Sequence, residues 1–185
     1  MQEFTAYHVV TDRPMELGQH IIFDDDHHSG VYQRVMMKAG LVGQIYAHPD
    51  KYPADSLDYP TMVALRELAL EQVRSEKFPH YPSRMACLYV SKTEEEARRW
   101  GEYFISLGRP TYALVKVHVR GTVFQGDACN CFDGGPDHAA NLRQAEHYWL
   151  NLPNMDNEPP ILEMLVGGDI EIVEILEEYN ANLPE

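Results

Sequence analysis

One acidic residue interrupts an apolar stretch near the C-terminus of this 185-residue chain. Glu163 lies within Ile161-Leu162-Glu163-Met164-Leu165-Val166, and its neighbours are residue types that usually fill a core. An edge strand can turn such an acid toward water, because strand faces alternate between polar and apolar. Alternatively, the acid lies at a cleft, where a fixed carboxylate can stabilise positive charge that develops during a reaction. The other candidate residues bear on this choice.

Two further polar residues fall on apolar segments. His8 lies near the end of an aromatic and β-branched segment, residues 4–11, and Ser91 ends the segment 85–91. A single histidine on a strand is ordinarily a core or surface residue. The loop 24–30 holds three Asp and two His, but their spacing matches no calcium loop and favours a solvated loop.

The cysteines do not predict a metal site or a disulfide framework. The chain has three, and Cys129 and Cys131 near His138 would make only half of a zinc site. Cys87 lies in an apolar strand, and the other two are too close along the chain for easy bridging. We expect free thiols, no metal and a reducing, cytoplasmic site of action, which also suits a protein delivered into another cell's cytosol.

Periodicity predicts strands and helices in an irregular order. Residues 112–120 alternate as a strand does, and Gly167-Gly168 between apolar flanks predicts a β-hairpin turn. Thr93 before three glutamates predicts a helix N-terminus. Helices are expected over residues 31–42, 61–77, 93–104 and 137–150. Because there is no regular βαβ rhythm, the sequence predicts an α+β fold.

Length and charge narrow the function classes. A chain of this length predicts a single domain over residues 1–185, and we expect its polar tail, 177–185, to fray. The formal charge of −14 argues against broad nucleic-acid binding, which needs clustered Lys and Arg. No apolar run is long enough to span a bilayer, and the N-terminus lacks the pattern of a secretion signal, so no membrane association is expected.

Three segments resemble, in their order, the motifs of the ADP-ribosyltransferase superfamily. They are Tyr7-His8, Leu88-Tyr89-Val90-Ser91 before a helix, and Glu163-Met164-Leu165-Val166, and the resemblance spans residues 4–176. It implies an ADP-ribosyltransferase-like α+β fold, with a split, curved antiparallel β-sheet and inserted helices, that clasps NAD. The segment Phe-Pro-x-x-Pro-Ser-Arg at 78–84 is similar to one of the bacterial branches, which implies an effector or toxin-like protein.

The resemblance implies three catalytic residues. Glu163 would hold a ribose hydroxyl and stabilise the cation that forms as nicotinamide leaves, as a carboxylate does at other glycosidic bonds. His8 would hydrogen-bond the nicotinamide ribose. Ser91 would steady that ribose or Glu163.

The resemblance also implies residues that bind NAD as the substrate. Tyr7 would line the cleft, and Tyr89 or Trp100 would stack on the nicotinamide ring. Arg13 or Arg84 would bind the pyrophosphate, because a guanidinium fork suits phosphate oxygens.

The implied function is transfer of a single ADP-ribose from NAD to a protein or small-molecule acceptor, with release of nicotinamide. Ile161 replaces the second acid of members that modify arginine, which argues against arginine as the acceptor. Tyr-Val-Ser-Lys in place of Ser-Thr-Ser leaves open a His-Tyr-Glu pattern, an Arg-Ser-Glu pattern and a catalytically silent relative. The alternative function is a binding module that keeps the NAD cleft or uses its acidic surface; action on RNA 2′-phosphates fits the acidity less well.

Overall fold

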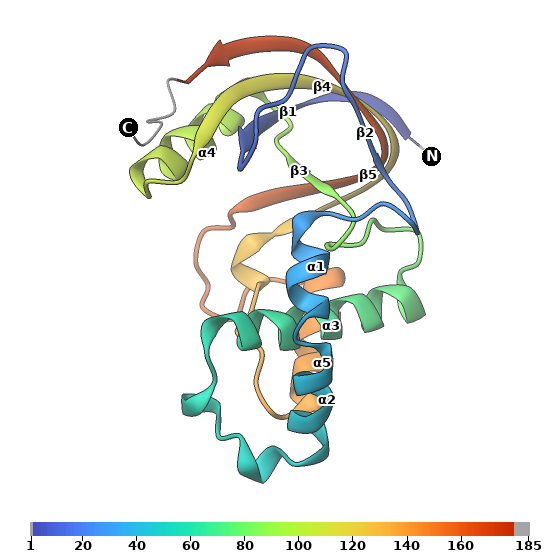
Figure 1. Cartoon of the computed structure of the whole chain (residues 1–185), viewed down its shortest axis with the longest axis vertical. Helices are drawn as coiled ribbons and strands as arrows, with labels where there is room; N and C mark the ends of the chain where they lie inside the picture. The colour runs from blue at the N-terminus through green and yellow to red at the C-terminus, as the bar shows by residue number, and fades with distance from the viewer. Residues whose placement is uncertain (1, 180–185) are drawn as a thin grey trace. The chain divides into compact units, whose positions relative to one another are not determined.

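Two compact units make up the chain. The computed structural model describes residues 2–179; among these, unit 1 comprises residues 2–24, 88–124 and 164–179, and unit 2 comprises residues 25–87 and 125–163 (Figure 1). The long strand β4 begins in unit 1 and ends in unit 2, and β5 begins in unit 2 and ends in unit 1. Whether these two units form the single domain that we predicted over residues 1–185 stays a prediction. Most of the tail that we expected to fray, residues 180–185, lies outside the described residues.

Unit 1 is built on an open antiparallel sheet. The strands are β1 (Gln2–Thr11), β2 (His20–Phe23), β3 (Leu88–Val90), β4 (Thr111–Asp127) and β5 (Leu162–Glu178). Their order is β1-β4-β5-β2, and β3 pairs with β5 beside that path. In Figure 1, β4 and β5 curve as they cross unit 1. This antiparallel sheet, together with the helices of the chain, confirms the prediction of an α+β fold with an antiparallel sheet.

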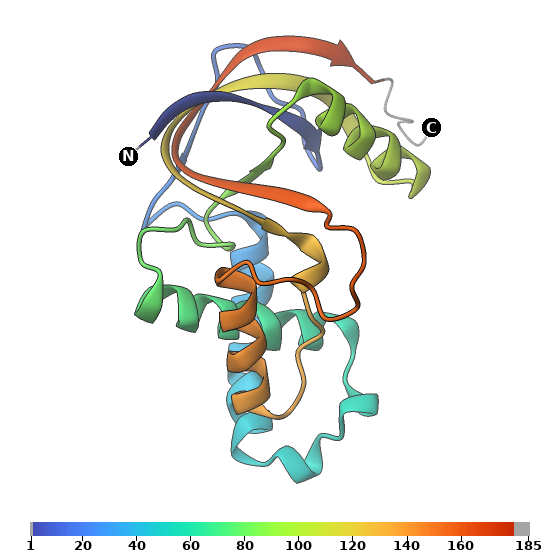
Figure 2. The same ribbon diagram turned by 180° about the vertical axis from the view of Figure 1, so that it is seen from behind.

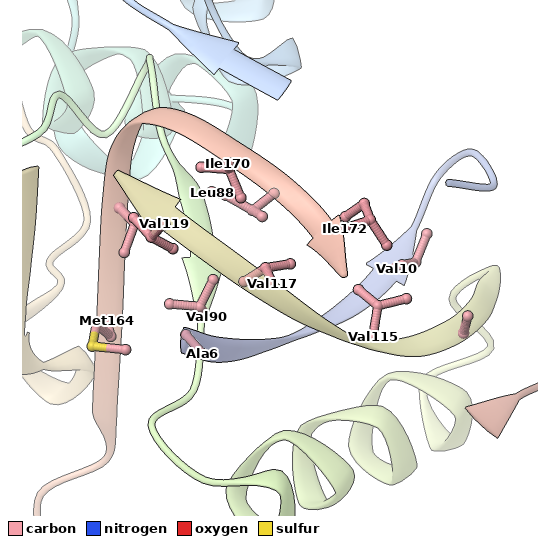
Figure 3. Packing of buried hydrophobic residues seen from close by; sticks show 12 residues of the cluster. Ala6, Val10, Leu88, Val90, Val115, Val117, Val119, Met164, Ile170 and Ile172 are labelled. Atoms are coloured by element: carbon pink, nitrogen blue, oxygen red, sulfur yellow. The ribbon is translucent and has the colours of Figure 1, made fainter. Parts of the chain in front are cut away.

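The period-two pattern divides the side chains of unit 1 between two faces of the sheet. On one face, Ala6 and Val10 of β1 pack with Val115 and Val117 of β4 (Figure 3). His8 lies on this face too, because it follows Ala6 by two residues and pairs in register with Val115. The sheet therefore holds an imidazole within an otherwise apolar layer.

The other face is covered by α4 (Glu94–Ser106). Ala97 and Trp100 of this helix pack near Val9 of β1 and Leu114 of β4. The predicted helix start at Thr93 is confirmed, because its side chain accepts a hydrogen bond from the backbone N–H of Glu96 and the Glu96 side chain returns one, which makes a capping box.

The prediction of a hairpin at Gly167-Gly168 is wrong. β5 runs without a turn from Leu162 to Glu178, and the glycines instead let it approach β4 closely. A Cβ at Gly121 would lie 1.7 Å from the carbonyl oxygen of Gly167. Gly168 has a φ of 103°, which side chains disfavour. A glycine pair with positive φ at one position is compatible with a hairpin turn and also with a continuous strand, so the sequence alone did not distinguish these two structures.

Gly121→Ala is expected to destabilise the protein by about 1–3 kcal/mol or more, because the added methyl group forces β4 and β5 apart. Gly43→Ala is the matched control, since a Cβ there meets nothing within 4 Å and alanine favours the helix that contains it. Urea denaturation measures both. Equal stabilities for the two variants would contradict the close approach of the strands.

Unit 2 is helical. Its helices are α1 (Gly30–Met36), α2 (Ala39–Ala47), α3 (Tyr59–Lys77) and α5 (His138–Trp149), with short 3-10 turns η1 (Pro49–Lys51), η2 (Ala54–Ser56) and η3 (Ala128–Asn130). The single helix expected over residues 31–42 is therefore wrong: the chain forms two helices, divided at Met37 and Lys38. Figure 2 shows α5 crossing α3, and the indole nitrogen of Trp149 donates to the carbonyl of Leu70 at 2.8 Å. This crossing fixes the C-terminal end of α5.

Candidate functional site

Glu163 is held in unit 2 by two donors. Its Oε1 accepts hydrogen bonds from Arg84 Nη1 at 2.9 Å and from the Tyr148 hydroxyl at 2.5 Å. The side chain is only 11% exposed, which contradicts the interpretation of a solvated acid on an edge strand. Oε2 accepts no hydrogen bond from any residue in the range 2–179. One carboxylate oxygen is thus fixed by the protein, and the other remains for a ligand or water.

Arg84 is shared between two acids, the buried Glu67 and the largely buried Glu163. Its Nε donates to Glu67 Oε2 at 3.0 Å, while Nη1 serves Glu163. Glu67 is 3% exposed and also pairs with Arg66 at 2.9 Å. The four formal charges balance, which offsets much of the cost of removing them from water. We call Arg66, Glu67, Arg84, Tyr148 and Glu163 the buried ionic cluster.

The connection before Glu163 is anchored at Asp127. The Asp127 carboxylate accepts hydrogen bonds from the Ile161 backbone N–H at 2.9 Å and from the Asn154 amide at 2.8 Å. Burial acts to raise the pKa of Asp127, but these hydrogen bonds and one from the Cys129 N–H hold it below its usual value. Because Ile161 is two residues before Glu163, this anchor defines where β5 begins.

The three cysteines are free thiols. Cys131 lies 3.6 Å from Arg84 Nη2, yet burial raises the pKa of its thiol, against the opposing effect of Arg84 and Arg66. Burial likewise raises the pKa of Cys87. Within the described part of the chain, no group of three or more His, Cys, Asp and Glu side chains could hold a metal ion.

His8 is a buried, neutral histidine in unit 1. Burial lowers its pKa to about 4, and Nδ1 lies 2.7 Å from the Tyr89 carbonyl oxygen. A carbonyl can only accept, so Nδ1 carries the proton and Nε2 is left as an acceptor. The ring is 9% exposed. His8 is therefore suited to accept a hydrogen bond from a hydroxyl group rather than to act as a cation.

The first two motifs meet at one point of unit 1. Tyr7 and Ser91 exchange backbone hydrogen bonds of 3.0 and 2.7 Å in an isolated antiparallel bridge. Opposed residues share a face and successive residues alternate, so the side chain of Ser91 lies on the face of Tyr7 and that of His8 on the other. Next to this bridge, the His8 side chain donates a hydrogen bond to the backbone carbonyl of Tyr89. The structure thus brings the backbones of these segments together, but the Tyr7 and Ser91 side chains do not lie on the same face of the sheet as His8.

The other proposed NAD-binding residues differ in exposure. Tyr89 is 39% exposed, whereas Trp100 packs against the core on the α4 face of the sheet. Arg13 is exposed and follows Asp12, which has a φ of 69° at the end of β1. Arg84, in contrast, is 6% exposed, and its nitrogens contact protein atoms.

Sequence reasoning missed Arg66, Glu67 and Tyr148. Glu71 and Arg74, on the same helix as Glu67, pair with each other at 2.7 Å, whereas Glu67 is buried and pairs with Arg66 and Arg84. The usable signal was that apolar residues lie three positions before and after Glu67, at Ala64 and Leu70.

Replacing His8 with Gln is expected to flatten the dependence of stability on pH. The unfolded state binds a proton near pH 6.5 and the folded state only near 4, so the folded state loses stability as pH falls through this window. The loss amounts to about 3 kcal/mol by pH 4, and it is absent above pH 6.5.

Urea denaturation of the wild type and His8→Gln at pH 7 and pH 5 measures this effect. His48→Gln is the control, because that histidine is exposed and should leave the wild-type dependence unchanged. The same slope in His8→Gln and the wild type would show that His8 is not buried in neutral form.

These features define an α+β protein with a bent antiparallel sheet, a neutral buried histidine and a carboxylate held in an ionic cluster. The chain belongs to the family described as Protein of unknown function (DUF2441), whose model matches residues 6–178. No curated protein matches the chain. Among the described residues, no helix is long and apolar enough to cross a membrane.

Proposed function

We propose that the protein is an NAD-dependent mono-ADP-ribosyltransferase with an ADP-ribosyltransferase-like split sheet. The bond from the nicotinamide nitrogen to the ribose anomeric carbon breaks, nicotinamide leaves with the bonding electrons, and an acceptor nucleophile bonds to that carbon and releases its proton. The acceptor is a protein or a small molecule, and the reaction takes place in a cytosol. NAD is the substrate, and no metal takes part.

The state of His8 is the observation that carries this proposal. A neutral imidazole whose Nδ1 proton is engaged by a backbone carbonyl presents Nε2 as an acceptor, which is what a ribose hydroxyl requires. The adjoining bridge joins the backbones of Tyr7 and Ser91, whose side chains lie on the face opposite His8, so the proposal rests on the imidazole and not on Ser91.

Glu163 supplies the carboxylate of the proposal. As nicotinamide leaves, positive charge grows on the anomeric carbon, and a carboxylate already fixed in position stabilises that state more than it stabilises bound NAD. Its unused Oε2 is the oxygen available for this role. Arg13, which is exposed, is the better candidate for the pyrophosphate, because the guanidinium of Arg84 is enclosed by Glu67 and Glu163.

One observation favours a second function, a silent NAD-binding module. The ion pair with Arg84 reduces the negative potential that Glu163 can direct at a cation. If that reduction dominates, the protein binds NAD through the same residues without breaking the glycosidic bond. The shared use of Arg84 by Glu67 acts against this outcome, because it leaves part of the charge on Glu163 uncompensated.

Incubation with NAD labelled in either half separates the two functions. Release of labelled nicotinamide, with adenylate label transferred to an acceptor in cell lysate, supports the enzyme. A rise in melting temperature with NAD but no release supports the silent module. Neither release nor stabilisation, with several lysates as the source of acceptor, would refute both.

A further inference from the structure

Tyr148 has a contact that the proposed mechanism does not yet use. Its hydroxyl lies 2.5 Å from Glu163 Oε1 and 2.5 Å from Arg84 Nη1. Because a guanidinium has only donors, the phenolic oxygen of Tyr148 accepts a hydrogen bond from Arg84, and the hydroxyl O–H donates a hydrogen bond to Glu163. The hydroxyl thus completes a triangle in which Arg84 donates to both partners.

The ring that carries this hydroxyl is immobilised. Tyr148 is 1% exposed, meets Trp149 edge-on at 4.9 Å between ring centroids, and lies under the guanidinium of Arg84 at 5.0 Å. Trp149 is itself tied to the carbonyl of Leu70. A donor held this firmly needs no rearrangement to keep its partner in place.

The hydroxyl and the guanidinium do different things to Glu163. Arg84 brings a full positive charge, which both orients the carboxylate and weakens its field. The neutral hydroxyl orients it at the same oxygen without adding a formal charge. Together the two donors occupy Oε1 and leave Oε2 without a protein donor among the described residues.

We infer that Tyr148 is a positioning residue that fixes the rotation of the Glu163 carboxylate and so presents Oε2 to the substrate. This inference rests on the proposed function for its catalytic consequence, but the orientation of Glu163 can be tested without it. Tyr148 contacts no substrate in this scheme and acts through Glu163 alone.

The variant Tyr148→Phe removes the hydroxyl and keeps the buried ring. We expect kcat for nicotinamide release to fall by about tenfold or more, while KM for NAD changes by less than about threefold, because orientation matters most as charge develops. Tyr46→Phe is the matched control: it removes a hydroxyl of unit 2 that accepts from Asn141 at 2.9 Å and does not touch Glu163. Its kcat should stay at the wild-type value.

A crystal structure of Tyr148→Phe shows the orientation of the Glu163 carboxylate, which would stay the same if the Tyr148 hydroxyl served only to stabilise the fold. Rotation of the Glu163 carboxylate, or a second conformer of it, is expected. An unmoved carboxylate held by Arg84 alone would overturn the inference, as would a kcat equal to that of Tyr46→Phe. If the wild type releases no nicotinamide, the proposed function fails, and the crystal structure still decides the role of Tyr148.

Discussion

We expect Glu163→Gln to lower the rate of the proposed nicotinamide release by about 10²–10³-fold, the effect of removing one preorganised electrostatic stabiliser. Glutamine keeps the shape of the side chain and an oxygen that accepts from Arg84 and Tyr148, so the loss isolates the charge. The rate of release at saturating NAD measures it. In the proposed reaction the affinity for NAD should fall less than the rate, because the charge interaction would be made mainly as the glycosidic bond breaks.

The buried position of Glu163 changes what is expected of stability. A glutamate in an open cleft could be neutralised at little cost, but this side chain is 11% exposed and paired with Arg84. Hydrogen bonds to charged groups contribute about 1.5–3 kcal/mol, so Glu163→Gln loses part of that range. Rates are therefore compared only after urea denaturation shows that both proteins are folded under the assay conditions.

Glu174→Gln is the matched control, since Glu174 lies on the same strand, is 55% exposed and, within residues 2–179, pairs only with Lys116, at 3.9 Å. It should keep the wild-type rate. A full rate in Glu163→Gln would remove this residue from the mechanism and leave the fold unaffected. A rate loss of the same size in both variants would show that the assay reports general charge rather than a site.

The sequence predicted those parts of the fold that depend on local patterns. Thr93 forms the expected start of α4, and the alternation in β1 sorts Ala6 and Val9 onto opposite faces of the sheet. Such signals need no information about distant residues. The prediction of a hairpin at Gly167-Gly168 was wrong because these glycines lie against Gly121, a residue far away in the sequence that leaves no local signal.

The candidate site was predictable only in part, for a related reason. Glu163 stood out because its neighbours along the chain are apolar. Glu67 and Tyr148 did not stand out, because each belongs to the site through a contact with Arg84, and no local sequence pattern indicates such a contact. The environment of His8 also depended on a distant group, the carbonyl of Tyr89.

Arg84→Met is expected to lower the free energy of unfolding by about 3–5 kcal/mol, the cost of leaving a largely buried charge without its partner. Methionine retains an unbranched apolar stem of similar reach but removes the cation with which Glu163 pairs. Glu67 is affected less, because Arg66 still pairs with it at 2.9 Å. Urea denaturation at neutral pH measures the loss.

Two further variants separate burial from charge. Arg99→Met removes an arginine of α4 that is 72% exposed and paired with Glu95, and its effect should be no larger than that of a surface ion pair. Arg84→Met combined with Glu163→Gln should be more stable than Arg84→Met alone, because the second change removes the acid that the first leaves unpaired. If Arg84→Met is as stable as Arg99→Met, the buried ionic cluster does not hold unit 2 together, and the fixed position of Glu163 must have another cause.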